Sequence, residues 1–363
     1  MTMIQRSYTV RFLTPAFLGN AEQNGEWRTP PFKALLRQWW RVAYAAKHEF
    51  KVDIARMRHE EGLLFGHAWL ENDVDDRGRE VAARHSSLRL RLDRWDAGTQ
   101  RGVAPEKSSA EMKYVAWGLI GRGAGVADRT ALKDAVSSST EGNATLRLAC
   151  PEDAVEMIET AVVLAHHFGT LGSRSRNGWG SLEFQGAPQA SGLLELADAH
   201  CDALERCISR PWAAALLGSD GHALIWESAR EYGSWGEAML GISTVKKELR
   251  RTLTLDPRNL SERHILGLPV KDSDPAGDKD VRMPSPIRFK VIRRDGRLAF
   301  RIVAMPHALP DAEGLDSEKP KPGRSRGGLQ RAQFKSVAEK AWPRIVDWLS
   351  KPEVSNVRRL TDR

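Results

Sequence analysis

The segment whose residue types most suggest chemistry is a glycine-rich stretch between positions 169 and 180. It combines four glycines with two serines and two arginines in GTLGSRSRNGWG. Glycines allow positive φ angles and let backbone N–H groups approach a phosphate closely, while serine hydroxyls can donate hydrogen bonds and arginines supply charge. The stretch therefore predicts a loop that cradles a sugar-phosphate backbone; a glycine-rich connection that contacts nothing is the alternative. The candidate contacts in it are Gly172, Ser173, Arg174, Ser175, Arg176, Asn177, Gly178 and Gly180.

A second candidate surface lies on a helix that we expect from Pro30 to Lys47, with Thr29 as its N-cap and Pro30 in its first turn. Steps of about 100° per residue separate two faces of this helix. One face is apolar and predicts core, at Phe32, Leu35, Leu36, Trp39, Ala43 and Ala46. The other combines cations with aromatic rings, as single-stranded RNA recognition requires, at Lys33, Arg37, Trp40, Arg41 and Tyr44. An ordinary solvated face, with Trp40 packed under a loop, is the alternative.

The elements around these two features predict an α+β fold. Alternating or β-branched segments predict strands at residues 7–13, 86–95, 113–120 and 144–150, and a helix follows at residues 151–169. The glycine-rich stretch then leads into a short strand. This order fits one antiparallel RRM-like or ferredoxin-like sheet with two helices packed on one face.

The second half of the chain is harder to interpret. Helical patterns cover about residues 190–209 and 228–253, and Asp295 with Gly296 marks the turn of a hairpin over residues 285–306. A basic connector with Lys319, Lys321, Arg324 and Arg326 precedes a terminal helix at about residues 329–350. With 363 residues we expect two domains, 1–188 and a more degenerate 189–363 with helical insertions.

Composition limits the function classes. The formal net charge of +8 and the pI near 9.5 favour a polyanionic partner, although a basic enzyme remains an alternative. The three cysteines form no CxxC pair, and the histidines form no HxxxH or HExxH pattern, so no disulfide framework, metal or other cofactor is expected. The N-terminus lacks a signal-peptide core and no apolar run reaches membrane-spanning length, which predicts a soluble cytoplasmic protein without membrane contact.

Two adjacent histidines are the main candidates for catalysis. His166 and His167 lie directly before the glycine-rich stretch, within reach of a phosphate bound there. Their place near the end of the expected helix also suits an interaction with its last carbonyl groups. Both interpretations stay open at this point.

Several motifs resemble the RAMP superfamily of RNA-binding proteins, and in particular the first RAMP subunit of type III-B CRISPR (Cmr) effector complexes. The glycine-rich stretch is similar to the signature loop of that family, and LTPAFLGN, RTPPFKALLRQWWR and LLFGHA are similar to its N-terminal elements. ILGLP and RMPSPIRFKV resemble parts of its second domain. The sequence departs from the pattern at Ala34 and at Asn20, where glycines are common.

The resemblance implies two RRM-like (RAMP) domains and a non-catalytic subunit of an antiviral ribonucleoprotein. Such a subunit binds near the 3′ end of the guide RNA (crRNA), captures single-stranded target RNA, and contacts other subunits of the CRISPR effector complex. The resemblance places RNA contacts on Lys33, Arg37, Trp40 and Arg41, on the loop from Gly172 to Gly180, and more loosely on Arg282 and Ser285. Because some RAMP proteins cleave guide RNA with a histidine, a metal-independent endoribonuclease using His166 and His167 is the rival hypothesis.

Overall fold

The structure is a computed structural model, and it describes most of the chain. The described residues are 2–22, 24–68, 70, 73–75, 77–98, 110–119, 135–138, 143–189, 192–268, 270, 282–309 and 331–361. The basic connector with Lys319, Lys321, Arg324 and Arg326 lies outside them.

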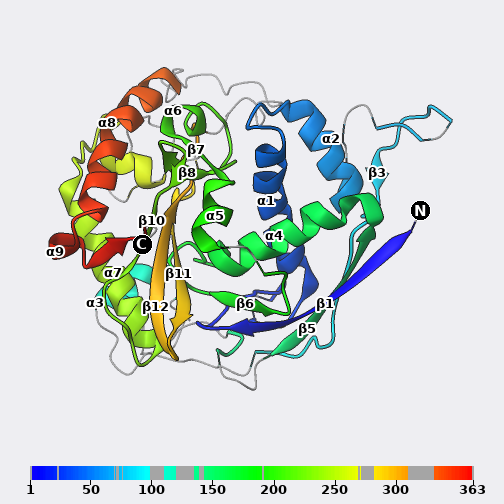
Figure 1. Ribbon diagram of the computed structural model, residues 1–363, viewed down its shortest axis with the longest axis horizontal. Coiled ribbons are helices and arrows are strands. Elements are labelled where there is room, and N and C mark those ends of the chain that lie inside the picture. The colour runs from blue at the N-terminus through cyan, green and yellow to red at the C-terminus, as the bar shows by residue number, and fades with distance from the viewer. Residues whose placement is uncertain are drawn as a thin grey trace.

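The first half of the chain builds a four-stranded antiparallel sheet in the order β4-β5-β1-β6. Its strands are β1 (Met3–Phe12), β4 (Arg89–Leu92), β5 (Ala144–Pro151) and β6 (Leu182–Gln185). Helices α1 (Thr29–Lys47) and α4 (Val155–Phe168) pack together over one face (Figure 1). Side chains along β1 alternate between the two faces of the sheet, so Tyr8, Val10 and Phe12 are buried on the face that these helices cover. The predicted α+β fold, with an antiparallel sheet and helices, is confirmed for this half.

The second half repeats this order of strands and helices. Strand β10 (Ile225–Ser228), helix α7 (Trp235–Thr252), strands β11 (Ile287–Arg294) and β12 (Arg297–Ala304), helix α8 (Arg331–Leu349) and strand β13 (Val357–Arg359) follow one another. They form an antiparallel sheet in the order β11-β12-β10-β13, which is the same arrangement as in the first sheet. The predicted hairpin is confirmed, and its turn has positive φ at Asp295 (48°) and Gly296 (82°).

Shorter elements connect and cover the two sheets. They are α2 (Ile54–Phe65), β2 (His67–Ala68), β3 (Ala83–Arg84), α3 (Ala110–Val115), the 3₁₀ helix Glu152–Ala154, α5 (Leu193–Asp198), β7 (Cys201–Ala203), α6 (Leu204–Cys207), β8 (Leu216–Ser219), β9 (His222–Ala223), the 3₁₀ helix Glu262–Leu266 and α9 (Pro352–Ser355). Among the described helices, none is long and apolar enough to cross a membrane.

Four local predictions are wrong. Residues 113–119 of the strand predicted at 113–120 do not form a strand, because α3 occupies its start and packs against α7. The helix expected at 190–209 is divided into α5, β7 and α6. Thr29 is the first helical residue rather than the N-cap, which is Arg28 without a side-chain cap. Helix α2 was not predicted, although the Asp53 carboxylate caps it by accepting from the N–H groups of Ala55 and Arg56.

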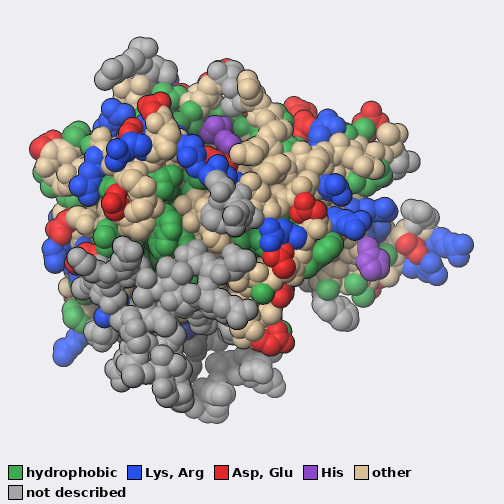
Figure 2. Space-filling view, turned by 90° about the horizontal axis from the view of Figure 1, so that it is seen from below, with side chains coloured by type: hydrophobic (Ala, Val, Ile, Leu, Met, Phe, Trp, Pro, Cys, Tyr) green, Lys and Arg blue, Asp and Glu red, His purple; other side chains and the backbone are tan. Residues whose placement is uncertain are grey.

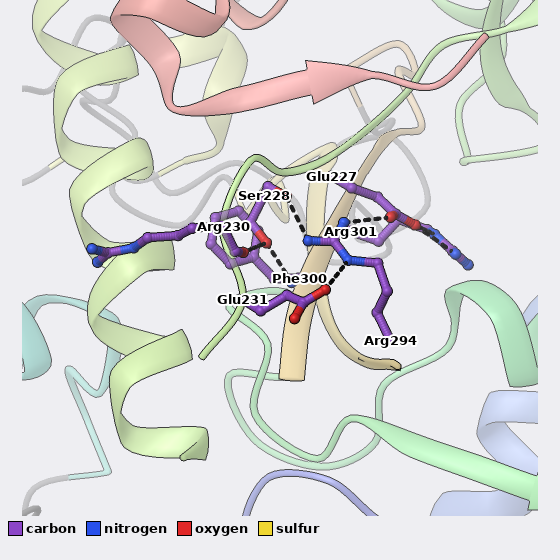
Figure 3. Close-up of polar contacts among 7 residues, drawn as sticks. All are labelled: Glu227, Ser228, Arg230, Glu231, Arg294, Phe300 and Arg301. Carbon is purple, nitrogen blue, oxygen red and sulfur yellow. Dashed lines mark hydrogen bonds and ion pairs between the residues drawn. The ribbon is translucent and has the colours of Figure 1, made fainter. Parts of the chain in front are cut away.

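Buried cations join the two halves. The Lys290 ammonium of β11 donates to the carbonyl oxygens of Gly169 and Leu182, each at 2.6 Å, so it satisfies backbone acceptors of the first half. Arg301 of β12 bonds the Glu227 carboxylate at 2.7 Å and the His167 carbonyl oxygen at 3.1 Å. Figure 3 shows Glu227 held between Arg301 and Arg294. These contacts lock the second sheet against the end of α4 and the loop that follows it.

Candidate nucleic-acid interface

The glycine-rich loop runs from the end of α4 to β6, and only its first part is accessible. Ser173 and Arg174 are exposed, whereas Asn177 and the three residues after it are buried. Gly178 has φ 92°, and a Cβ there would lie 2.7 Å from Ile242 of α7; a Cβ on Gly180 would lie 1.8 Å from a backbone oxygen. These two glycines therefore allow close packing of the protein on itself, and the prediction that they approach a phosphate is wrong.

Half of the backbone N–H groups of the loop are also occupied. Ser173 donates to the Phe17 carbonyl oxygen, Asn177 to that of Arg174, Gly178 to that of Ser175, and Gly180 to that of Pro15. In the described part of the chain, the N–H groups of residues 174–176 have no acceptor. An anion can therefore meet three consecutive free backbone donors at these residues, the first of which has φ 56°.

The predicted basic and aromatic face of α1 is covered rather than open. Trp40 and Tyr44 are 3% and 1% exposed, and the Trp40 ring packs against Tyr44 and against Phe65 of α2. The prediction that these rings lie open to stack on bases is wrong, because the unpredicted helix α2 packs across this face.

The same helix α2 supplies one carboxylate that pairs with both arginines of that face. The buried Glu61 carboxylate pairs with Arg37 at 2.8 Å and with Arg41 at 2.6 Å. Burial raises the pKa of Glu61, but the hydrogen bonds from the two arginines outweigh it and hold the pKa below its usual value. The anion that this i, i+4 pair of arginines favours is thus supplied by the protein itself. Lys33, one turn earlier, is half-buried, and burial and then Arg37 lower its pKa.

A pocket of about 440 Å³ opens between the glycine-rich loop and the second sheet. Its lining comes from α1, the loop, α7, the segments 266–268 and 283–285, and the start of β11. The lining residues are Gln38, Thr170, Arg174, Ser175, Arg176, Asn177, Lys246, Arg250, Leu266, Gly267, Leu268, Met283, Pro284, Ser285 and Arg288. Five of these side chains are basic and none is acidic. The pocket therefore concentrates positive charge at the junction of the two halves.

Arg288 forms the floor of the pocket. Its side chain is 8% exposed, its Cζ lies 5.8 Å from the ring centroid of Trp39, and the amide oxygen of Gln38, turned towards it, accepts from its terminal nitrogens. Its Nε atom has no partner in the described structure. Burial, and then the neighbouring Arg176, lower the pKa of Arg288 well below its usual value. The guanidinium thus has only neutral partners in a site that desolvates it.

Lys246 and Arg250, which share one face of α7, add two further basic side chains to the pocket. The Lys246 ammonium donates to the side-chain oxygen of Asn177 and lies 5.6 Å from the ring centroid of Tyr114. Burial, and then Arg250 and Arg174, lower the pKa of Lys246 to about 7. Burial lowers the pKa of Arg176 to about 10. An anion in the pocket would favour the charged form of each of these groups.

The structure brings some predicted site residues together and leaves others apart. Residues 174–177 and Ser285 line the pocket, and Arg282 is an exposed neighbour of that lining. Lys33, Arg37, Trp40, Arg41, Gly172, Ser173, Gly178 and Gly180 do not line it. The sequence interpretation missed Gln38, Lys246, Arg250 and Arg288. One signal was available, because Arg288 and Lys290 alternate with the apolar Ile287, Phe289 and Val291 at the start of the strand and so face one side of it.

An exposed aromatic ring lies close to this pocket. Trp117 is 58% exposed and directly precedes Gly118, where a Cβ would lie 3.0 Å from the Nη2 atom of Arg174. The neighbouring Val115 carbonyl oxygen accepts from the side chains of Asn177 and Trp179, which fixes this segment against the loop. The segment thus presents an indole beside the basic loop.

In the view from below, Lys and Arg side chains lie in separate groups, with Asp and Glu side chains between them (Figure 2). No continuous basic patch dominates the described side chains seen from this side. The unpaired charge of the pocket is the more specific feature.

His166 and His167 lie apart from the pocket lining. The Nδ1 atom of His166 accepts a hydrogen bond from the Phe184 N–H at 3.1 Å. The imidazole rings of His166 and His167 pack edge to face. The pKa of His166 is lowered to about 4 and that of His167 to about 3, and burial is the largest cause of both shifts. Among the described residues, no group of His, Cys, Asp or Glu side chains could hold a metal ion.

Comparisons with known proteins agree with the motifs. Residues 9–183 match the family described as the RAMP superfamily. The fold is similar to the crystal structure of Cmr1 from Pyrococcus furiosus in its apo form, with a TM-score of 0.46 and 13% identity over 94% of this chain and 97% of that one. It is also similar to a chain in the cryo-EM structure of the type III-B Cmr-beta complex bound to cognate target RNA, with a TM-score of 0.45 and 10% identity over 95% of this chain and all of that one. No curated protein sequence matches the chain. The first half of the chain, residues 9–183, is thus similar to the RAMP superfamily.

Proposed function

We propose that the protein is a non-catalytic RNA-binding subunit of a type III-B CRISPR ribonucleoprotein effector complex. In this proposal it contacts the 3′ region of the guide RNA, captures single-stranded target RNA in antiviral defence, and works in the cytoplasm beside other subunits of the complex. The observation that carries the proposal is the pocket, where Arg174, Arg176, Lys246, Arg250 and Arg288 have no carboxylate partner in the described part of the chain. Such charge suits the phosphates of RNA.

In this proposal the chain consists of two RAMP domains, residues 1–188 and 189–363. The recurrence of the same strand and helix order in both sheets supports this division. The glycine-rich loop belongs to the first domain, and Arg288, Lys246 and Arg250 belong to the second. RNA would therefore bind where the two domains meet, and binding would depend on their relative placement.

Trp117 supplies the aromatic half of RNA recognition in place of the buried Trp40. Its exposed indole lies in the segment that contacts Arg174, so a nucleotide whose phosphate enters the pocket can place its base near this ring. Stacking of this kind tolerates any base, because every base has a π face. Sequence selection is then left to pairing between guide and target.

The test is incubation of the purified chain with labelled single-stranded RNA, with and without EDTA, analysed by gel shift and for cleavage products. We expect a salt-sensitive shift with intact RNA in both conditions. Absence of binding at low salt would contradict the proposal. Cleavage that persists in EDTA and disappears in a variant with both His166→Ala and His167→Ala would replace it by an endoribonuclease.

A further inference from the structure

The pocket has a charge that exceeds what one internal RNA phosphate can balance. Its five basic side chains form no ion pair with any described residue, and its lining contains no Asp or Glu. By contrast, Arg301 and Arg294 of the same sheet are paired with Glu227. The absence of carboxylates thus does not extend to all buried cations of this sheet, and Lys290, which also lacks one, donates to backbone carbonyl oxygens instead.

Burial makes this imbalance costly in the empty protein. Arg288 is 92% shielded, with Gln38 and Trp39 as neutral partners and an Nε atom that has none. A cation removed from water without a counter-ion loses hydration energy that neutral partners only partly replace. A ligand anion that reaches Arg288 would compensate for this lost hydration energy. Arg288 belongs to the lining of the pocket.

The neutral donors of the pocket suit the oxygens of a phosphate. Ser175 and Thr170 add hydroxyl groups to the lining, and the free backbone N–H groups of residues 174–176 are at the same loop. The volume of about 440 Å³ lies in the range of small-ligand pockets. The pocket is therefore large enough for one phosphate group with its sugar.

An internal phosphodiester and a terminal phosphomonoester differ in charge. The diester carries one negative charge, whereas the monoester carries about −1.5 to −2 near pH 7 and presents three terminal oxygens. Five basic side chains from the loop, α7 and β11 match the monoester better, since it balances more of their charge than a single diester does.

We infer that the pocket between the glycine-rich loop and β11 is a binding site for a phosphomonoester group, namely the terminal phosphate of an RNA strand. The inference rests on the proposed function, because it assigns the anion site to an RNA end. A free mononucleotide offers the same phosphomonoester, so the test must distinguish the two sources.

The test compares a short single-stranded RNA in four forms, with a phosphate or a hydroxyl at its 3′ end and with a phosphate or a hydroxyl at its 5′ end. Each competes with a fluorescent RNA, and uridine monophosphate is a fifth competitor. We expect one phosphorylated end to bind about tenfold tighter than the matching hydroxyl end. Arg288→Met should abolish this preference, whereas Arg147→Met, which removes an exposed arginine from β5, should keep it.

The outcomes separate the inference from the proposed function. If the wild-type protein binds phosphate ends and hydroxyl ends with equal affinity, the inference is overturned while the proposed function stands. This comparison does not depend on the folding of any variant. If no RNA binds but uridine monophosphate raises the melting temperature, the phosphomonoester site stands, its source is a free nucleotide, and the RNA end is ruled out. If neither RNA nor the nucleotide binds, both the inference and the proposed function fail.

Discussion

The guanidinium group of Arg288 in β11 lies over the ring of Trp39 in α1, with 5.8 Å between the Cζ atom and the ring centroid. The two residues come from different halves of the chain and are separated by most of its length. Their contact holds a desolvated cation in the lining of the basic pocket, which the glycine-rich loop also lines. The pocket thus depends on how the two halves pack.

Replacing Arg288 by methionine should separate stability from RNA binding. Methionine keeps the packing against Trp39 but removes a buried charge that has only neutral partners. We therefore expect the free energy of unfolding to rise by about 1–3 kcal/mol while RNA affinity falls. Urea unfolding and an RNA titration on the same preparation measure both quantities. A destabilised variant with unchanged affinity would mean that Arg288 is a structural residue.

Replacing the arginine pair on α1 should lower stability and leave RNA binding unchanged, which is the reverse of the effect expected for Arg288→Met. Replacing Arg37 and Arg41 by methionine leaves the Glu61 carboxylate buried without a cation, so the double variant should lose about 3 kcal/mol of stability. The salt dependence of RNA binding should stay unchanged, because both guanidinium groups are held by Glu61 and lie outside the pocket lining. Adding Glu61→Gln to the double variant should restore part of the stability. A reduced salt dependence would return these arginines to the RNA interface.

An alanine at Trp117 should weaken RNA binding if the indole stacks on a base. The expected loss is about 1–3 kcal/mol, and Trp117→Phe should retain most of the affinity because it keeps an aromatic face. Trp95 is 55% exposed and lies near Arg91, so Trp95→Ala is a matched control for losing an exposed indole. Fluorescence anisotropy with one labelled RNA measures all three variants. Equal effects at Trp117 and Trp95 would exclude a specific stacking role.

Stability should fall in mild acid because two buried histidines are neutral in the folded state. The pKa values of His166 and His167 are lowered to about 4 and about 3, whereas an unfolded histidine titrates near 6.5. Between about pH 6.5 and 4 the unfolded chain binds more protons, so the free energy of unfolding decreases as the pH falls through this window.

Urea midpoints at neutral pH and at about pH 4.5 measure this effect. His167→Phe removes one of the two titrating groups and should reduce the difference between the midpoints, whereas His85→Phe, at an exposed position, should not. The same pH dependence in all three proteins would mean that other groups control the acid stability.

Local patterns predicted the elements of the first sheet well. Alternation in β1, the periodicity of α1 and the Asp295–Gly296 turn each determine a strand, helix or hairpin from neighbouring residues alone. The outcome for Trp40 differed because helix α2 packs over it, and the cap at Asp53 that begins α2 was overlooked. A single helix shows which residues share a face, but its packing partner decides whether that face is exposed.

The composition of the pocket could be predicted only in part. The loop arginines were evident from glycine-rich sequence around them, and Ser285 was reached through a family motif. Arg288, Lys246 and Gln38 join these residues through tertiary packing between segments far apart in the sequence. Charges within an apolar strand, such as Arg288 and Lys290, show that one side of β11 meets polar groups, but they do not identify those groups.

The salt dependence of RNA binding tests the central claim most directly. Equilibrium binding of one single-stranded RNA is measured across a range of salt concentrations for the wild-type protein, for Arg174→Ala with Arg176→Ala, and for the control Arg147→Met. If both loop arginines contact phosphates, the slope of log affinity against log salt should fall by about two in the double variant and stay at the wild-type value in the control. A wild-type slope in the double variant would contradict the assignment of the pocket to RNA.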